Sequence, residues 1–243
     1  MSSLKLWGTI VNTATVILGS SFGLLIKFLL SRVSGGFKEK GKAFGAALSD
    51  TLMKGLALCT LAIGAAGAIK TENHLILILS ITIGGIIGTL LDLDKLLNLL
   101  GAKIEARTKG KDGSVSQGFV SASLLFCVGA MTIIGALNSG ISSDHQMLYT
   151  KSILDLISST VLAASLGFGV LLSAVFVFVF QGTITLLAGL LAPLLSAAVI
   201  TEMTAAGSVL IIGLAFNLLG VSKIKIMNYL PAMFIPILLC MIM

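Results

Sequence analysis

The chain has 243 residues, 56% of them hydrophobic and only 11% charged, with a net charge of +6. Because soluble domains carry about a quarter charged residues, this composition excludes a water-soluble globule and a disordered chain, and three cysteines are too few for a secreted disulfide scaffold. It predicts an all-α, polytopic helical membrane protein. Nearly all basic residues flank apolar runs, which is typical of positive-inside topology and argues against nucleic-acid binding.

The first half of the chain holds three apolar runs, at about 6–30, 48–69 and 75–91. Each is close to the roughly 20 residues that a spanning helix needs. Only Lys5 precedes the first run and a basic cluster follows it, so it predicts a retained helix with its N-terminus outside, not a cleaved signal peptide. Segment 92–118 is polar and basic with helically spaced leucines, and we expect an amphipathic stretch at the cytoplasmic surface.

The second half predicts five further helices, at about 119–137, 153–172, 173–200, 204–219 and from 229 onward. The second and third divide one apolar stretch that is too long for a single span, and their turn is expected near Leu172 and Ser173. Pro231 and Pro236 should kink the last helix. The prediction is one transmembrane domain, residues 1–243, with about eight helices and both termini outside.

A weak internal repeat relates the two halves of the chain, 1–118 and 119–243. Segments 12–25 and 157–171 each open with a small polar cluster and continue to a Gly-Phe-Gly-like sequence. Four helices in each half would give both halves one orientation, as in parallel-repeat transporters. Matches among small and apolar residues also arise by chance, so both interpretations stay open.

Polar groups in the first and fifth helices are candidates for a binding site, because uncommitted polar groups are expensive in the hydrocarbon core. We expect a mid-membrane site between these helices. Its ligating residues would be Asn12, Thr13, Thr15, Ser158, Ser159 and Thr160. The alternative is that the hydroxyl groups bond their own helices and the neighbouring glycines form packing faces.

Three further polar residues extend this site. Asp155 follows Lys151 by one helical turn, and it is either the partner in an interfacial ion pair or a gating or proton-carrying carboxylate. Gln181 and Asn217 lie inside apolar runs. Their amides either bond across helices or line a path for the transported species.

Other charged residues have structural interpretations. Asp50 and Lys54 are one helical turn apart, so a structural ion pair near the inner face is expected. Glu202 falls between two apolar runs and is expected in a solvated outer loop. The sequence has no Walker loop, HExxH or CxxC motif. It therefore predicts no enzyme, no catalytic residue, no metal site and no cofactor.

Five short segments carry a family resemblance: Gly8–Asn12, Leu125–Gly135, Lys151–Asp155, Gln181–Gly182 and Asn228–Ala232. They resemble the YdfK/YqgA family, a domain-of-unknown-function family of bacterial inner-membrane proteins, and the resemblance spans nearly the whole chain. It implies a multi-pass protein of the bacterial plasma membrane. It also supports Asn12, Asp155, Gln181 and Asn217 as site residues, but it implies no substrate.

The leading hypothesis is a non-ATP-driven transporter of a small solute or ion, whose mid-membrane site lies between the first and fifth helices. Asp155 would be the outer gate or proton-coupled carboxylate, with Gln181 and Asn217 lining the path. A passive ion channel is the closest alternative, and a membrane scaffold or sensor is the third. The bilayer and the solute are the expected partners, and small-residue faces permit a homo-oligomer without requiring one.

Overall fold

The computed structural model describes residues 5–36, 39–95, 99 and 114–242, and their regular structure is helical throughout, which confirms the all-α class. The first half of the chain forms α2 (Trp7–Gly36), α3 (Glu39–Ala68) and α4 (His74–Leu91). The second half forms α6 (Ser114–Cys127), α7 (Ala130–Ser142), α8 (Gln146–Leu166), α9 (Gly169–Leu186), α10 (Ala188–Leu191), α11 (Ala197–Leu218), the 3-10 helix η1 (Ile226–Met233) and α12 (Ile235–Ile242).

Four of the described helices are long and apolar enough to cross a membrane, and they cover 7–29, 74–91, 169–186 and 197–218. The bent pair α6–α7 makes a fifth if it counts as one span. The described residues thus support four or five apolar spans, and the expected eight are not confirmed. The amphipathic segment expected at 92–118 lies mostly outside the described residues.

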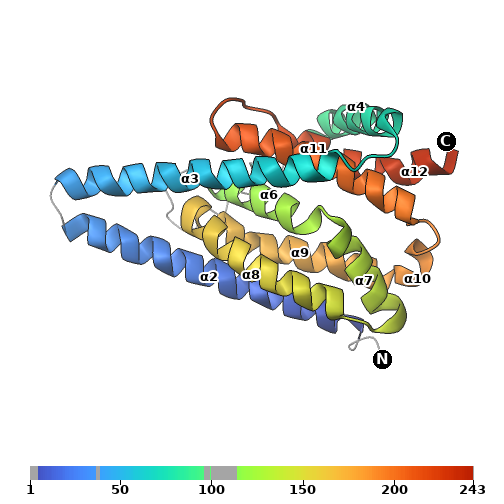
Figure 1. Cartoon of the computed structure of the whole chain (residues 1–243), viewed down its shortest axis with the longest axis horizontal. Helices are drawn as coiled ribbons and strands as arrows, with labels where there is room; N and C mark the ends of the chain where they lie inside the picture. The colour runs from blue at the N-terminus through green and yellow to red at the C-terminus, as the bar shows by residue number, and fades with distance from the viewer. Residues whose placement is uncertain (1–4, 37–38, 96–98, 100–113, 243) are drawn as a thin grey trace.

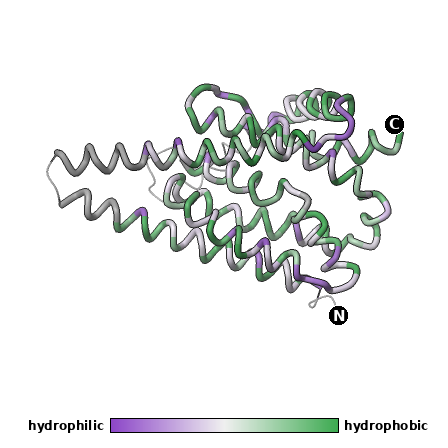
Figure 2. Tube along the Cα trace, in the orientation of Figure 1, coloured by the Kyte–Doolittle hydropathy of each residue, from purple (hydrophilic) through white to green (hydrophobic). Residues whose placement is uncertain are grey.

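The long helices run side by side in two groups (Figure 1). In one group α3 packs on α11, and α4 packs on η1; in the other α2 packs on α8, and α9 contacts both α2 and α8. Helix α6 contacts α8, α9 and α11, so it joins the groups. Figure 2 shows hydrophobic residues along most of the helices and hydrophilic ones mainly at the loops.

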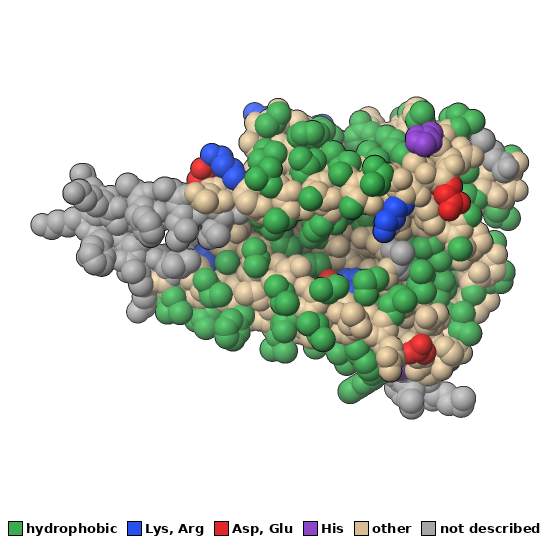
Figure 3. Space-filling model, in the orientation of Figure 1, with side chains coloured by type: hydrophobic (Ala, Val, Ile, Leu, Met, Phe, Trp, Pro, Cys, Tyr) green, Lys and Arg blue, Asp and Glu red, His purple; other side chains and the backbone are tan. Residues whose placement is uncertain are grey.

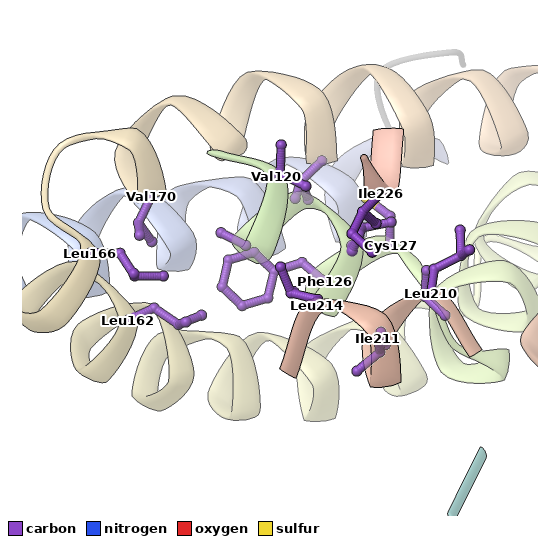
Figure 4. Close-up of a cluster of buried hydrophobic side chains, with 14 of the residues drawn as sticks. Val120, Phe126, Cys127, Leu162, Leu166, Val170, Leu210, Ile211, Leu214 and Ile226 are labelled. Atoms are coloured by element: carbon purple, nitrogen blue, oxygen red, sulfur yellow. The ribbon is translucent and has the colours of Figure 1, made fainter. Parts of the chain in front are cut away.

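The main apolar core lies where these groups meet (Figure 4). Phe126 of α6, Leu162 of α8, Val170 of α9 and Leu214 of α11 belong to one cluster of buried side chains. On the exposed surface of α3, Lys54 Nζ lies 2.7 Å from Asp50 Oδ2, which confirms the ion pair expected from their spacing.

The helix expected at 119–137 is broken. Helix α6 ends at Cys127, α7 begins at Ala130, and their axes differ by 61°. Gly129 has a φ of +155°, which glycine adopts far more readily than other residues. The Thr132 hydroxyl donates to the Phe126 carbonyl oxygen at 2.9 Å, so it satisfies one carbonyl that the break releases.

The turn between α8 and α9 lies at Gly167 and Phe168, so its expected position near Leu172 is wrong. Gly167 has a φ of +77°, a left-handed value that favours glycine. The Gly-Phe-Gly sequence is therefore the turn after a helix, whereas α2 is continuous through its related segment. This difference leaves the internal repeat without support.

The expected last helix is divided into η1 and α12. Pro231 lies inside η1, and Pro236 is the second residue of α12. Because proline lacks an N–H group and restricts the residue before it, one continuous α-helix does not form here. The two pieces are too short for a complete span.

Candidate functional site

Three residues that are far apart in the sequence form a buried polar chain. Asn12 of α2 donates through Nδ2 to Asp155 Oδ2 of α8 at 2.8 Å, and Gln181 of α9 donates through Nε2 to Asn12 Oδ1 at 2.6 Å. Asn12 and Gln181 are fully buried, and Asp155 is 6% exposed. Three of the predicted site residues therefore lie together and tie three helices to one another.

Lys151 supplies a positive charge beside these hydrogen-bonded residues. Its ammonium group donates to Asp155 Oδ2 one helical turn away, and both side chains are buried. Lys151 Nζ also lies 5.8 Å from the centre of the Phe126 ring, within the range of a cation–π interaction. The ion pair, one of the two alternatives expected from the sequence, is thus present, and both of its members are buried in the protein.

Most of the predicted hydroxyl groups form hydrogen bonds within their own helices. Thr15, Ser159 and Thr160 each donate to a backbone carbonyl oxygen three or four residues earlier. The Thr13 hydroxyl is buried and has no hydrogen-bond partner among the described residues. This pattern agrees with the alternative in which helix-bound hydroxyls are structural.

A packed seam occupies the space between α2 and α8. A Cβ atom on Gly19 would lie 2.1 Å from Ser159 Oγ and 2.3 Å from the Leu156 carbonyl oxygen. One turn further on, a Cβ atom on Gly23 would lie 2.2 Å from the Thr160 carbonyl oxygen. These glycines allow the backbones to approach closely, so this part of the seam has no room for a ligand.

A cavity of about 580 Å³ lies on another side of α8, between α8, α3, α11 and the α6–α7 break; we name it the larger cavity. Figure 3 shows the surface hollowed between α3 and α8, with basic and acidic side chains at the bottom of the hollow. Lys151, Asp155 and Ser158 line it from α8. Of the predicted site residues, only Asp155 and Ser158 do so.

Helix α11 lines the larger cavity with a stripe of residues. Thr201, Thr204, Ser208 and Ile211 follow one another at helical spacing on one face. The Thr204 hydroxyl is buried and has no hydrogen-bond partner among the described residues. These residues are absent from the predicted set, although their three- and four-residue spacing is a signal in the sequence.

Asn217 lies apart from this cavity. Its Nδ2 group donates to the Ile224 carbonyl oxygen at 2.7 Å, and its Oδ1 atom accepts from Ser222 Oγ and from the Ile224 backbone N–H. It closes the turn after α11 and lines a second cavity of about 340 Å³, which we name the smaller cavity. Lys223 and Lys225 also line the smaller cavity.

Glu202 corrects another expectation, because it is only 2% exposed and lies inside α11, not in a solvated loop. Its carboxylate accepts from Thr71 Oγ1 at 2.6 Å and from the backbone N–H groups of Glu72 and Asn73 at 2.7 and 3.0 Å. It therefore fixes the loop between α3 and α4 beside Lys70, which lines the larger cavity.

Comparison with known proteins finds relatives along almost the whole chain. The uncharacterized membrane protein YdfK of Bacillus subtilis (strain 168) is 30% identical over 235 residues, which cover 95% of this chain and 94% of the relative. The uncharacterized protein YqgA of Escherichia coli (strain K12) is 29% identical over 232 residues, covering 93% and 92%.

No solved structure matches the chain. The model of a family described as a protein of unknown function, DUF554, matches residues 7–241. The match includes both cavities and the hydrogen-bonded residues Gln181, Asn12 and Asp155. The resemblance to YdfK and YqgA proteins is confirmed by both relatives. This membrane protein therefore belongs to the DUF554 family.

Proposed function

We propose that the chain is a non-ATP-driven transporter of a small solute or ion, which binds in the larger cavity. The observation that carries the proposal is a buried Lys151–Asp155 ion pair whose two members line that cavity. Charged side chains within membrane helices are costly, and they commonly mark substrate or ion pathways. Stability alone is a weak reason to keep such a pair, because apolar replacements of buried pairs are often neutral or stabilising.

The broken helix α6–α7 supports this proposal. Gly129 in the break, and Met131 and Thr132 in the first turn of α7, line the larger cavity. Non-helical backbone at membrane depth is tolerated where it is buried or lines a cavity, and discontinuous helices frame the sites of many transporters. The break and the ion pair therefore give two independent reasons to place a ligand here.

The relation between the two cavities favours a carrier over a passive channel. Phe126 and Ile211 line the larger cavity, whereas Val120 and Leu214 line the smaller one. All four belong to the same buried apolar cluster (Figure 4). A packed layer thus separates the cavities, as expected for a carrier that is open on one side.

In this proposal Asp155 is the gating or proton-coupled carboxylate. Asn12 and Gln181 hold the carboxylate in position, and their hydrogen bonds couple its gating or protonation state to α2 and α9. The positive-inside rule places Lys223, Lys225 and the smaller cavity on the cytoplasmic side of a bacterial plasma membrane. The larger cavity then faces the outer half of the bilayer, and both termini lie outside.

Reconstitution of the full chain into proteoliposomes tests the proposal. Uptake of radiolabelled rubidium, chloride, acetate, alanine and laurate is measured for the wild type and for the double variant Lys151→Met/Asp155→Asn, which removes both charges together. The matched control is Asp50→Asn/Lys54→Met, because that pair has the same spacing but is exposed on α3. We expect uptake of at least one tracer that is lost in the first variant and kept in the second. Equal uptake by both variants, or none above empty liposomes, contradicts the proposal.

A further inference from the structure

The charges of the larger cavity are unbalanced. Among the described residues, its charged lining consists of Lys70, Lys151 and Asp155, which gives a net charge of +1. The buried Lys151–Asp155 pair is neutral, so the excess charge is that of Lys70, which is exposed, and it favours an anionic ligand over a cationic one. Asp155 takes one of the three N–H donors of the Lys151 ammonium group, which leaves two for an anionic ligand.

The polarity of the cavity changes from its rim to its floor. Ile63 of α3 and Leu154 of α8 line it and are 53% and 51% exposed, whereas Lys151 and Asp155 are each 6% exposed. The ion pair therefore lies at the bottom, whereas the exposed part of the lining carries Ile63 and Leu154 together with Lys70. A ligand with a charged end and an apolar body matches this order.

The opening lies on the side of the helix bundle. The long helices run across the view of Figure 1, and in the same view the hollow between α3 and α8 faces the reader in Figure 3. Helices α3 and α8, which frame the hollow, pack on the candidate spans α11 and α2, and spanning helices cross the bilayer along their length, so this opening faces the acyl chains. A ligand dissolved in the bilayer can then reach Lys151 between Ile63 and Leu154.

We infer that the larger cavity binds an amphiphilic monocarboxylate, such as a fatty acid, which enters from the bilayer. The carboxylate lies at Lys151, with the Thr204 hydroxyl, which has no partner in the described part of the chain, as a second donor. The hydrocarbon chain leaves between Ile63 and Leu154. The inference names the substrate class of the proposed transporter and rests on that function. A carboxylate carries one negative charge, equal in size to the net charge of +1 of the whole lining, whereas a phosphate monoester carries about −1.5 to −2 charges.

Binding of tritiated laurate to the full chain in phosphatidylcholine nanodiscs tests the inference, with empty nanodiscs as background. Dodecanol and dodecylamine share the chain length of laurate but present a neutral or a cationic end. We expect saturable laurate binding that unlabelled laurate displaces and that the alcohol and the amine do not. Displacement by dodecanol or dodecylamine as effective as that by laurate overturns the inference.

Three variants locate the site. Lys151→Met/Asp155→Asn should weaken laurate binding about tenfold or more, because it removes the charge-assisted bond. Thr204→Leu should weaken binding by filling the cavity, and it removes no hydrogen bond seen among the described residues. Asp50→Asn/Lys54→Met should bind like the wild type. Unchanged laurate binding in the first two variants overturns the inference.

The binding and uptake experiments fail in different ways. If uptake of a tracer depends on Lys151 and Asp155 but laurate does not bind, the substrate class is wrong and the transporter proposal stands. If laurate binds as expected but no tracer, laurate included, crosses the bilayer, the binding site stands and the transporter proposal is wrong.

Discussion

Asp155 is held by donors from two different helices. Its Oδ2 atom accepts from Lys151 of the same helix and from Asn12 of α2. The two donors are not equivalent, because only Lys151 neutralises the carboxylate charge. Lys151 therefore makes the larger contribution to keeping an ionised group in the interior.

Lys151→Met is expected to destabilise the protein more than Lys151→Met/Asp155→Asn. The single variant leaves a buried carboxylate without a counter-charge, which typically costs about 3–5 kcal/mol. In the double variant the amide oxygen at position 155 still accepts the Asn12 hydrogen bond, and no charge is left. Thermal unfolding in detergent measures the difference. Equal loss in the two variants would mean that Lys151 acts through packing alone.

Glu202→Gln is expected to loosen the loop between α3 and α4. The carboxylate accepts three hydrogen bonds from this loop, and bonds to charged groups contribute about 1.5–3 kcal/mol each. Amide hydrogen exchange of Glu72 and Asn73 should therefore accelerate by about tenfold or more. Glu72→Gln is the control, because it changes an exposed carboxylate in the same loop. Unchanged exchange in Glu202→Gln would contradict this role.

Some of the site residues could be predicted from the sequence, and others could not. Asn12, Asp155 and Gln181 stand out because amides and carboxylates are rare inside apolar runs. Their mutual contacts depend on the packing of α2, α8 and α9, which no local pattern specifies. The burial of Glu202 could not be predicted, because this residue lies near the end of an apolar run, where an acidic residue is ordinarily expected in a solvated loop.

At the scale of elements, the α2–α8 pair depends on small residues. Gly19→Ala is expected to lower the thermal unfolding temperature in detergent, because its Cβ atom would lie 2.3 Å from a backbone oxygen of α8. Gly55→Ala in α3 is the control, since its Cβ atom would meet nothing within 4 Å. That change should be neutral or stabilising by up to about 1 kcal/mol, because alanine favours the helix. Equal effects of the two substitutions would exclude close packing at Gly19.

Helix boundaries follow from the sequence only where polarity changes. The α4 helix was predicted within one residue, because polar residues flank its apolar run. Between α8 and α9 the sequence stays apolar, so hydrophobicity gives no boundary and the turn is set by Gly167. The break at Gly129 is hidden in the same way, inside the apolar segment 119–137.

For the whole molecule, the class of membrane protein follows from composition, but the cavities do not. Each cavity is lined by residues from helices that are distant in sequence, so its existence depends on how α3, α6, α8 and α11 pack. The site predicted from the sequence lies between α2 and α8, where the close approach at Gly19 and Gly23 leaves no room for a ligand. The larger cavity lies on another side of the same helix, and Asp155 connects the two regions.

The packed layer between the cavities gives the last prediction. Leu214 lies one turn beyond Ile211 on α11, and these residues line opposite cavities. Leu214→Ala should open a passage and allow tracer to leak from preloaded proteoliposomes. A barrier lowered by about 1.4 kcal/mol gives a leak that is about tenfold faster.

Leu162→Ala is the matched control for this leak. Leu162 belongs to the same buried cluster and is as inaccessible as Leu214, but it lines neither cavity. Both substitutions should lower stability by a similar amount, about 2–5 kcal/mol, because each removes the same buried atoms. Only Leu214→Ala should raise the leak of rubidium, chloride or acetate. If both variants leak equally, loss of packing anywhere in the core permits passage, and the layer has no special role.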